Sequence, residues 1–175
     1  FNRDQSSFSL RTLSEEKSEA IELFKIVLQK PNFDKEILDR EAKRYVANIA
    51  QAETMPEAIA TKRFMKSIYG EHPYGLPSSG TIESINRIKV AHLEKFYKKY
   101  YVANQADIVI VGDVTKAEAE LIAKDISSGL PVNNNINAIP DVKKVEKQET
   151  RISQPAKQAH LYYGVPIMKR NDPDF

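Results

Sequence analysis

Hydrophobic residues recur three and four positions apart between residues 33 and 53, and this stretch carries the longest helix signal of the chain. Glu41 lies inside the apolar stripe, four residues after Ile37 and four before Tyr45, and Asn48 follows on nearly the same side. Burying a carboxylate costs on the order of several kcal/mol unless a charge, a metal ion or hydrogen-bond donors compensate it. We therefore expect Glu41 to have a partner.

The same spacing predicts four further helices, each with a start or a stop signal. The first covers residues 14–30 and lies between Ser14 and Pro31, and the second covers residues 56–69, from Pro56 to the stop at Gly70. The third covers residues 89–101. The fourth begins at the capping box of Thr115 and Glu118 and ends at Gly129. Residues 70–80 contain three glycines and two prolines and are predicted to be an irregular loop. Residues 130–141 are rich in Asn and Pro and are typical of a linker.

Four segments have the pattern of β-strands. Residues 107–111 form a short apolar run ended by Gly112, which indicates a strand buried on both faces. The other three, residues 6–13, 142–152 and 158–164, alternate or are rich in aromatic residues. The predicted strands at residues 6–13 and 107–111 are separated by a block of helices. This order favours an α+β domain over a doubly wound parallel sheet.

Composition excludes several classes of protein. The 26 basic and 24 acidic residues are mixed along the chain with a net charge of +2, so no basic stripe indicates nucleic-acid binding. The absence of cysteine excludes disulfides and thiolate metal sites. No apolar run approaches the roughly 20 residues that span a bilayer. Because the chain begins at Phe1 in the middle of a pattern, we expect it to be a fragment.

The chain alone offers no zinc-binding motif, because His72, His92 and His160 are far apart and none belongs to H-E-x-x-H or H-x-x-E-H. His72 is either functional or a loop histidine that hydrogen-bonds its own turn. Tyr74 is either a general acid or an aromatic side chain that packs beneath the loop. For Glu41, the alternative to a functional role is a pairing with arginine or with backbone donors.

Three blocks of sequence resemble the pitrilysin or insulinase-type zinc peptidases, the inverzincins. They are residues 6–41, then GEHPYGLPSSGTIESINRI at 70–88, then LEKFYKKYYVANQADIVIVGDVT at 93–115. QPAKQAHLYYGVP and RNDPDF near the end are similar to the start of the second, structurally similar domain of that family. The resemblance implies an α+β fold with a mixed, mainly antiparallel sheet and helices packed on one face, here truncated, with an exposed edge that can pair with other copies.

The resemblance also implies a division of the chain. Residues 1–130 would be the C-terminal major part of a first peptidase-like domain, residues 131–157 a linker and connecting strand, and residues 158–175 the start of a truncated second domain.

In that family, zinc is bound by H-x-x-E-H on a helix upstream of this stretch and by a glutamate on the long helix. Phe33, Leu38, Arg40 and Glu41 match the family pattern, but Asn48 stands where the zinc-ligand glutamate should be, seven residues after Glu41. A neutral amide binds Zn²⁺ poorly beside carboxylate or imidazole. We therefore expect no catalytic residue and no metal ligand in this stretch, and structural roles, or roles around a site, for Glu41, His72 and Tyr74.

The resemblance thus favours a non-catalytic subunit or half that helps enclose peptide substrates for a zinc-bearing homologue. One alternative is part of an active zinc metalloendopeptidase whose H-x-x-E-H helix lies upstream, and a second is a structural assembly subunit. The expected partners are a peptide and a homologous peptidase subunit or domain, without nucleic acid or a membrane span. Paired bacterial subunits of the family are often exported, which implies a periplasmic or otherwise extracytoplasmic location, with a cytoplasmic one as the alternative.

Overall fold

The computed structural model of the chain describes residues 1–169 and 172–174, so part of the RNDPDF motif lies outside the described residues. The chain divides into two compact units. Unit 1 consists of Phe1–Leu38 and Ile88–Asn137, and unit 2 consists of Asp39–Arg87 and Ala138–Phe175. Each unit is described by itself below.

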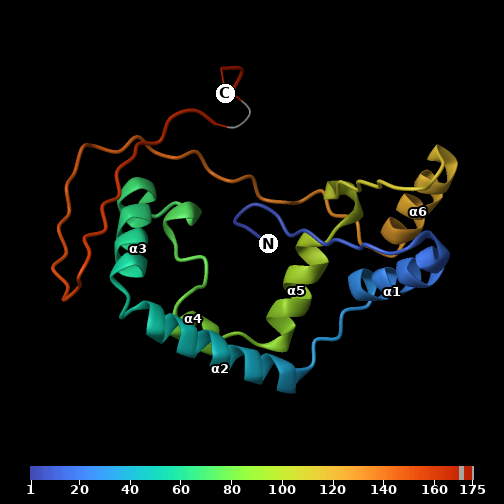
Figure 1. The fold of residues 1–175 in the computed structure, drawn as a ribbon, viewed down its shortest axis with the longest axis horizontal. Coiled ribbons are helices and arrows are strands. Elements are labelled where there is room, and N and C mark those ends of the chain that lie inside the picture. Colours follow the sequence, from blue (N-terminus) through green and yellow to red (C-terminus); the bar gives the residue numbers. More distant parts are fainter. Residues whose placement is uncertain (170–171, 175) are drawn as a thin grey trace. The chain divides into compact units, whose positions relative to one another are not determined.

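The regular elements are helices, and most of them begin and end where the sequence predicts (Figure 1). Unit 1 holds α1 (Lys17–Gln29), α5 (Val90–Tyr100) and α6 (Lys116–Ser128), while unit 2 holds α3 (Pro56–Tyr69) and the short α4 (Ile82–Asn86). The long α2 (Lys35–Ala52) begins in unit 1 and continues in unit 2. Among the described residues, three single 3-10 turns complete the set: η1 (Ser14–Glu16), η2 (Pro73–Gly75) and η3 (Ala103–Gln105).

Local capping chemistry explains these boundaries. Pro56 takes the first helical position of α3, and Gly70 ends that helix with φ +56°, in the left-handed region that favours glycine. The predicted capping box opens α6, since the Thr115 side chain accepts from the Glu118 N–H and Glu118 reaches back to the Thr115 N–H. The start of α2 is fixed by Asp34, whose Oδ1 accepts from the N–H groups of Glu36 at 2.7 Å and Ile37 at 3.1 Å.

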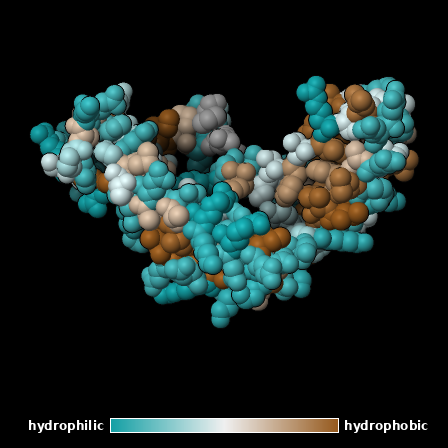
Figure 2. Space-filling model, turned by 60° about the horizontal axis from the view of Figure 1, so that its bottom comes forward, coloured by the Kyte–Doolittle hydropathy of each residue, from teal (hydrophilic) through white to brown (hydrophobic). Residues whose placement is uncertain are grey.

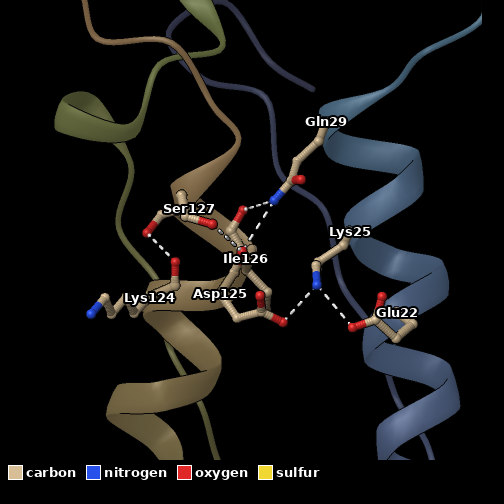
Figure 3. Close-up of polar contacts among 8 residues, drawn as sticks. Glu22, Lys25, Gln29, Lys124, Asp125, Ile126 and Ser127 are labelled. Carbon is tan, nitrogen blue, oxygen red and sulfur yellow. Dashed lines mark hydrogen bonds and ion pairs between the residues drawn. The ribbon is translucent and has the colours of Figure 1, made fainter.

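In unit 1, α1 packs against α6 through polar side chains (Figure 3). Lys25 Nζ lies 2.8 Å from Asp125 Oδ2 and 2.8 Å from Glu22 Oε1, and the hydrogen bond to Asp125 is the main reason that the pKa of Lys25 is raised. Gln29 Nε2 donates to the carbonyls of Asp125 at 3.1 Å and Ile126 at 2.9 Å. Gln29 therefore satisfies two of the carbonyls that the last turn of α6 leaves without helical partners.

Tyr97 connects α5 to the end of α1 in the same unit. Its hydroxyl donates to the Leu28 carbonyl at 2.7 Å, and its ring meets Phe33 edge-on with 5.9 Å between the centroids. Burial raises the pKa of Tyr97. Its neighbours Phe96 and Tyr100 stay about half exposed, at 52% and 42%, so Tyr97 is the better buried of the three aromatic side chains.

In unit 2, part of the tail that follows Ala138 runs beside α3 (Figure 1). Gln148 Nε2 donates to the Ser67 carbonyl at 2.9 Å, and the ring of Tyr162 lies 5.7 Å from that of Phe64. A Cβ on Gly164 would come within 3.2 Å of the Phe64 ring, so glycine permits this close approach. Side chains, rather than a backbone ladder, hold this extended tail on the helix.

The predicted α+β fold with a mixed, mainly antiparallel sheet is wrong for this structure. Within residues 1–169 and 172–174 no strand is present, and the segments 6–13, 107–111, 142–152 and 158–164 are extended but not paired. The prediction that 107–111 is buried on both faces is also wrong, because Val109 is 84% exposed and Val111 92%.

The physical reason is that alternation sets only a local preference, whereas a strand exists only when its N–H and C=O groups pair with a second segment. The segments 6–13, 142–152 and 158–164 have side-chain partners instead. Phe8 of segment 6–13, for example, packs edge-on against Tyr101 with 5.8 Å between the centroids, and the Tyr101 hydroxyl reaches Ser6 Oγ at 3.3 Å.

The two hydrogen bonds from Gln29 predict a local stability effect. In Gln29→Ala the last turn of α6 loses both, and we expect the free energy of local opening there to fall by about 1 kcal/mol, the usual contribution of a capping bond. Amide hydrogen exchange along α6 measures this change. Gln105→Ala, which removes an exposed glutamine of the same unit, is the matched control. Equal exchange in the two variants would contradict the assigned role of Gln29.

Candidate functional site

Glu41 obtains its partners from its own helix. Arg44 places Nη2 2.6 Å and Nε 2.8 Å from Glu41 Oε2, and Arg40 Nε lies 3.3 Å from Oε1. These guanidinium groups, Arg44 foremost, hold the pKa of Glu41 below its ordinary value. The carboxylate is only about two-thirds shielded, with 35% of its side chain exposed. The expected partner of Glu41 is therefore a pair of arginines.

Asn48 lies further along α2, and its side chain is exposed. Seven residues of helix advance about 10 Å and return to nearly the same face, so Glu41 and Asn48 lie on one side of α2, about two turns apart. Within the described ranges, no three His, Cys, Asp or Glu side chains come together as a metal site. A neutral amide and a carboxylate already held by two arginines do not fit Zn²⁺ as a donor set.

The loop after α3 brings His72 and Tyr74 together. The Tyr74 N–H donates to His72 Nδ1 at 3.1 Å, and the two rings lie 4.9 Å apart, edge to face. Tyr69, at the end of α3, contacts both rings: it is tilted against His72 with 6.0 Å between the centroids and meets Tyr74 edge-on at 5.6 Å. His72 Nε2 lies 2.8 Å from the carbonyl of Pro140. The contacts of the described residues do not join Glu41 to this cluster.

A shallow depression on the surface of α5 was not predicted. It is lined by Ala91, Glu94, Lys95, Lys98 and Lys99. The spacing of these residues along one helical face was the available signal, but lysines at such spacing are typical of any solvated helix.

Among the described helices none is both long and apolar enough to cross a membrane.

Comparison with known proteins identifies the class to which the chain belongs. Residues 87–175, about half of the chain, match the family described as the peptidase M16 inactive domain. The chain therefore belongs to this family, which confirms the predicted pitrilysin or insulinase-type membership.

Two curated relatives illustrate the range of names in the family. The chain is 27% identical over 91% of its length to a Helicobacter pylori protein named "Non-peptidase homolog YmxG". It is 26% identical over 78% of its length to an "Uncharacterized zinc protease" of Rickettsia bellii. The chain spans 37% and 33% of these two relatives, or about a third of their length.

The fold is similar to two solved structures. A crystal structure of a peptidase M16 inactive domain from Pseudomonas fluorescens superimposes with a TM-score of 0.72 and 32% identity, covering 76% of this chain and 32% of the other. A protease from Helicobacter pylori gives a TM-score of 0.62 at 23% identity, covering 78% of this chain and 33% of the other, and this second likeness concerns the fold alone.

The arginine pair at Glu41 predicts a titration effect. A depressed carboxyl pKa means that the pairing stabilises the folded chain above the ordinary glutamate pKa of about 4.3, and that this stabilisation is lost as the pH falls through the depressed value. In Arg44→Gln we expect the pKa of Glu41 to rise toward its ordinary value, as measured by NMR titration of the Glu41 carboxyl carbon. Arg40→Gln should raise it less, because the Arg40 contact is longer.

The control for this titration is Arg63→Gln, a change at an exposed arginine of α3 that should leave the pKa of Glu41 where it is. If Arg44→Gln and Arg63→Gln titrate alike, the pairing with Arg44 does not govern Glu41.

Proposed function

We propose that the chain is part of a non-catalytic subunit or half of a peptidase of the M16 family, which helps to enclose peptide substrates for a zinc-bearing homologue. The observation that carries the proposal is Asn48. By the resemblance to the family pattern, it stands where a zinc-ligand glutamate is expected; it lies exposed on α2, and a neutral amide does not supply the charge of such a ligand.

The surroundings of Asn48 support the same proposal. Glu41 is the acid nearest in sequence on the same face of α2, and Arg40 and Arg44 already neutralise it. A zinc ligand must instead offer its lone pairs to the metal. The description of the matching family as an inactive domain, and the name non-peptidase homolog of the Helicobacter pylori relative, agree with this assignment.

A second candidate function rests on the other names. The Rickettsia bellii relative, and a Streptomyces coelicolor relative that is 20% identical over 97% of this chain, are both named uncharacterized zinc proteases. Under this candidate, the full-length protein is itself a zinc endopeptidase, and the ligands come from sequence outside residues 1–175. The division into domains at residues 130 and 157 and the extracytoplasmic location stay predictions.

Zinc content and peptidase activity of the full-length protein separate the two candidates. We expect the protein alone to bind no stoichiometric zinc, measured by elemental analysis, and to leave an unstructured fluorogenic peptide uncut. Mixed with its zinc-bearing homologue, it should support cleavage, because it closes the peptide chamber that the homologue needs. Equimolar zinc and cleavage by the protein alone would contradict the proposal and favour the zinc endopeptidase.

Asn48→Glu and Asn48→Gln form a matched pair for this experiment, since both lengthen the side chain and only the first adds a charge. Zinc uptake by Asn48→Glu but not by Asn48→Gln would identify the absence of a carboxylate at residue 48 as the reason that this half is non-catalytic. Zinc uptake by the unmodified protein and by both variants would show that residue 48 is irrelevant to the metal, contrary to the proposal.

A further inference from the structure

The depression on α5 lies on one side of that helix, here called the lysine face and made by Ala91, Glu94, Lys95, Lys98 and Lys99. These residues recur three and four positions apart, so their side chains are neighbours on the helix surface. Lys95 and Lys98 are exposed, and Lys99 is half-buried. Three ammonium groups thus gather at one hollow in unit 1.

The pairing of the charges distinguishes this face from an ordinary solvated helix. Among the described residues no carboxylate forms an ion pair with any of its three lysines. Glu94 and Lys98 are four positions apart, in the order that favours an ion pair on a helix, and still do not pair. On α6, by contrast, Lys116 and Glu120 at the same separation lie 3.8 Å apart. The lysines of α5 are therefore left for another partner.

The helix itself does not neutralise the lysine face. Lys98 and Lys99 belong to the last turn of α5, where the helix dipole favours positive charge. That dipole is equivalent to only about half of a negative charge. Three lysines and one glutamate leave a charge of +2 on the face, so most of the positive charge is still uncompensated.

Two aromatic side chains border the lysine face. Phe96 and Tyr100 are about half exposed, and their ring centroids lie 4.8 Å apart. Lys99 Nζ lies 5.0 Å from the centre of the Tyr100 ring, so the aromatic pair adjoins the cations directly. Aromatic side chains are enriched where proteins bind other polypeptides. The surface thus offers apolar contact beside unpaired charge.

We propose that the lysine face of α5 binds an extended acidic segment of polypeptide that carries carboxylates at alternate positions. Residues 91–99 rise about 12 Å along the helix. An extended peptide covers this distance in about four residues, and its alternate side chains lie about 6.6 Å apart on one side. Lysines three or four positions apart on a helix have Cβ atoms about 5–6 Å apart. Two carboxylates of the peptide therefore meet two lysines at once.

Other anions fit this face less well. A single phosphate is bound best by converging donors such as the fork of an arginine, and no arginine lines the depression. A nucleic-acid strand carries a charge on every phosphate, and its binding needs more cations than three lysines beside a glutamate supply. The proposal does not rest on the proposed function, because it concerns binding to α5 and not the presence of zinc.

Carbodiimide coupling on the full-length protein tests the proposal, because it joins a lysine amine to a carboxylate that lies against it. The probe is an acetylated and amidated peptide of about nine residues in which Glu alternates with Ser, long enough to span the face at about 3.3 Å per residue. Mass spectrometry identifies the coupled lysines. We expect coupling at Lys95 and Lys98 to exceed coupling at Lys43 and Lys124, exposed lysines of α2 and α6, by about fivefold. About 0.5 M sodium chloride should remove the excess, because salt screens exposed charges.

Two substitutions at exposed glutamates form a matched pair for this experiment. Glu94→Gln removes the negative charge of the lysine face and should raise coupling at Lys95 and Lys98 by about twofold. Glu57→Gln, at an exposed position of α3, should leave it unchanged. Both replace a surface side chain by one of the same shape, so the fold is preserved.

Three results would overturn the proposal. One is coupling spread evenly over the exposed lysines, Lys43 and Lys124 included. The second is an equal effect of Glu94→Gln and Glu57→Gln. The third is suppression of the coupling by a single-stranded DNA oligonucleotide at a lower concentration than by an uncoupled excess of the acidic peptide, which would identify the partner as nucleic acid.

Discussion

Hydrogen bonds from side chains to distant main-chain carbonyls are the constraint on which both units depend. In unit 1, Gln29 reaches the last turn of α6 and Tyr97 reaches the last turn of α1, and in unit 2, Gln148 reaches α3 and His72 reaches Pro140. Among the described residues no large side chain is completely buried, and many apolar side chains remain at the surface (Figure 2). Because few apolar side chains are buried, these directional hydrogen bonds determine which segments lie together.

The helices could be predicted because their signals are local. Pro56 and Gly70 set the ends of α3, and Thr115 with Glu118 sets the start of α6, through contacts within one turn of the chain. The strands could not be predicted in the same way, because pairing depends on a second segment. Residues 107–111 have the composition of a buried strand, yet Val109 and Val111 are exposed and unpaired.

In the candidate site too, contacts between residues close in sequence could be predicted and contacts between distant residues could not. An acid within an apolar stripe correctly indicated that Glu41 needs a partner, and Arg44 lies close enough in sequence for that partner to be found there. The bond between His72 and Pro140 joins residues 68 positions apart, and no spacing rule reaches that far. The stripe was also less buried than its pattern indicates, since Ile37 is 48% exposed and Asn48 is exposed.

The outer side of the tail has a consequence for the behaviour of the protein in concentrated solution. Leu161, Tyr163, Val165 and Ile167 alternate along the tail, and each is at least 71% exposed. An exposed, uncharged alternation of residues with high β-propensity is an aggregation hazard. Gly164 and Pro166 interrupt it, because glycine weakens an extended segment and proline cannot donate to a ladder. The tail can thus stay apolar outside and still be a poor seed for amyloid.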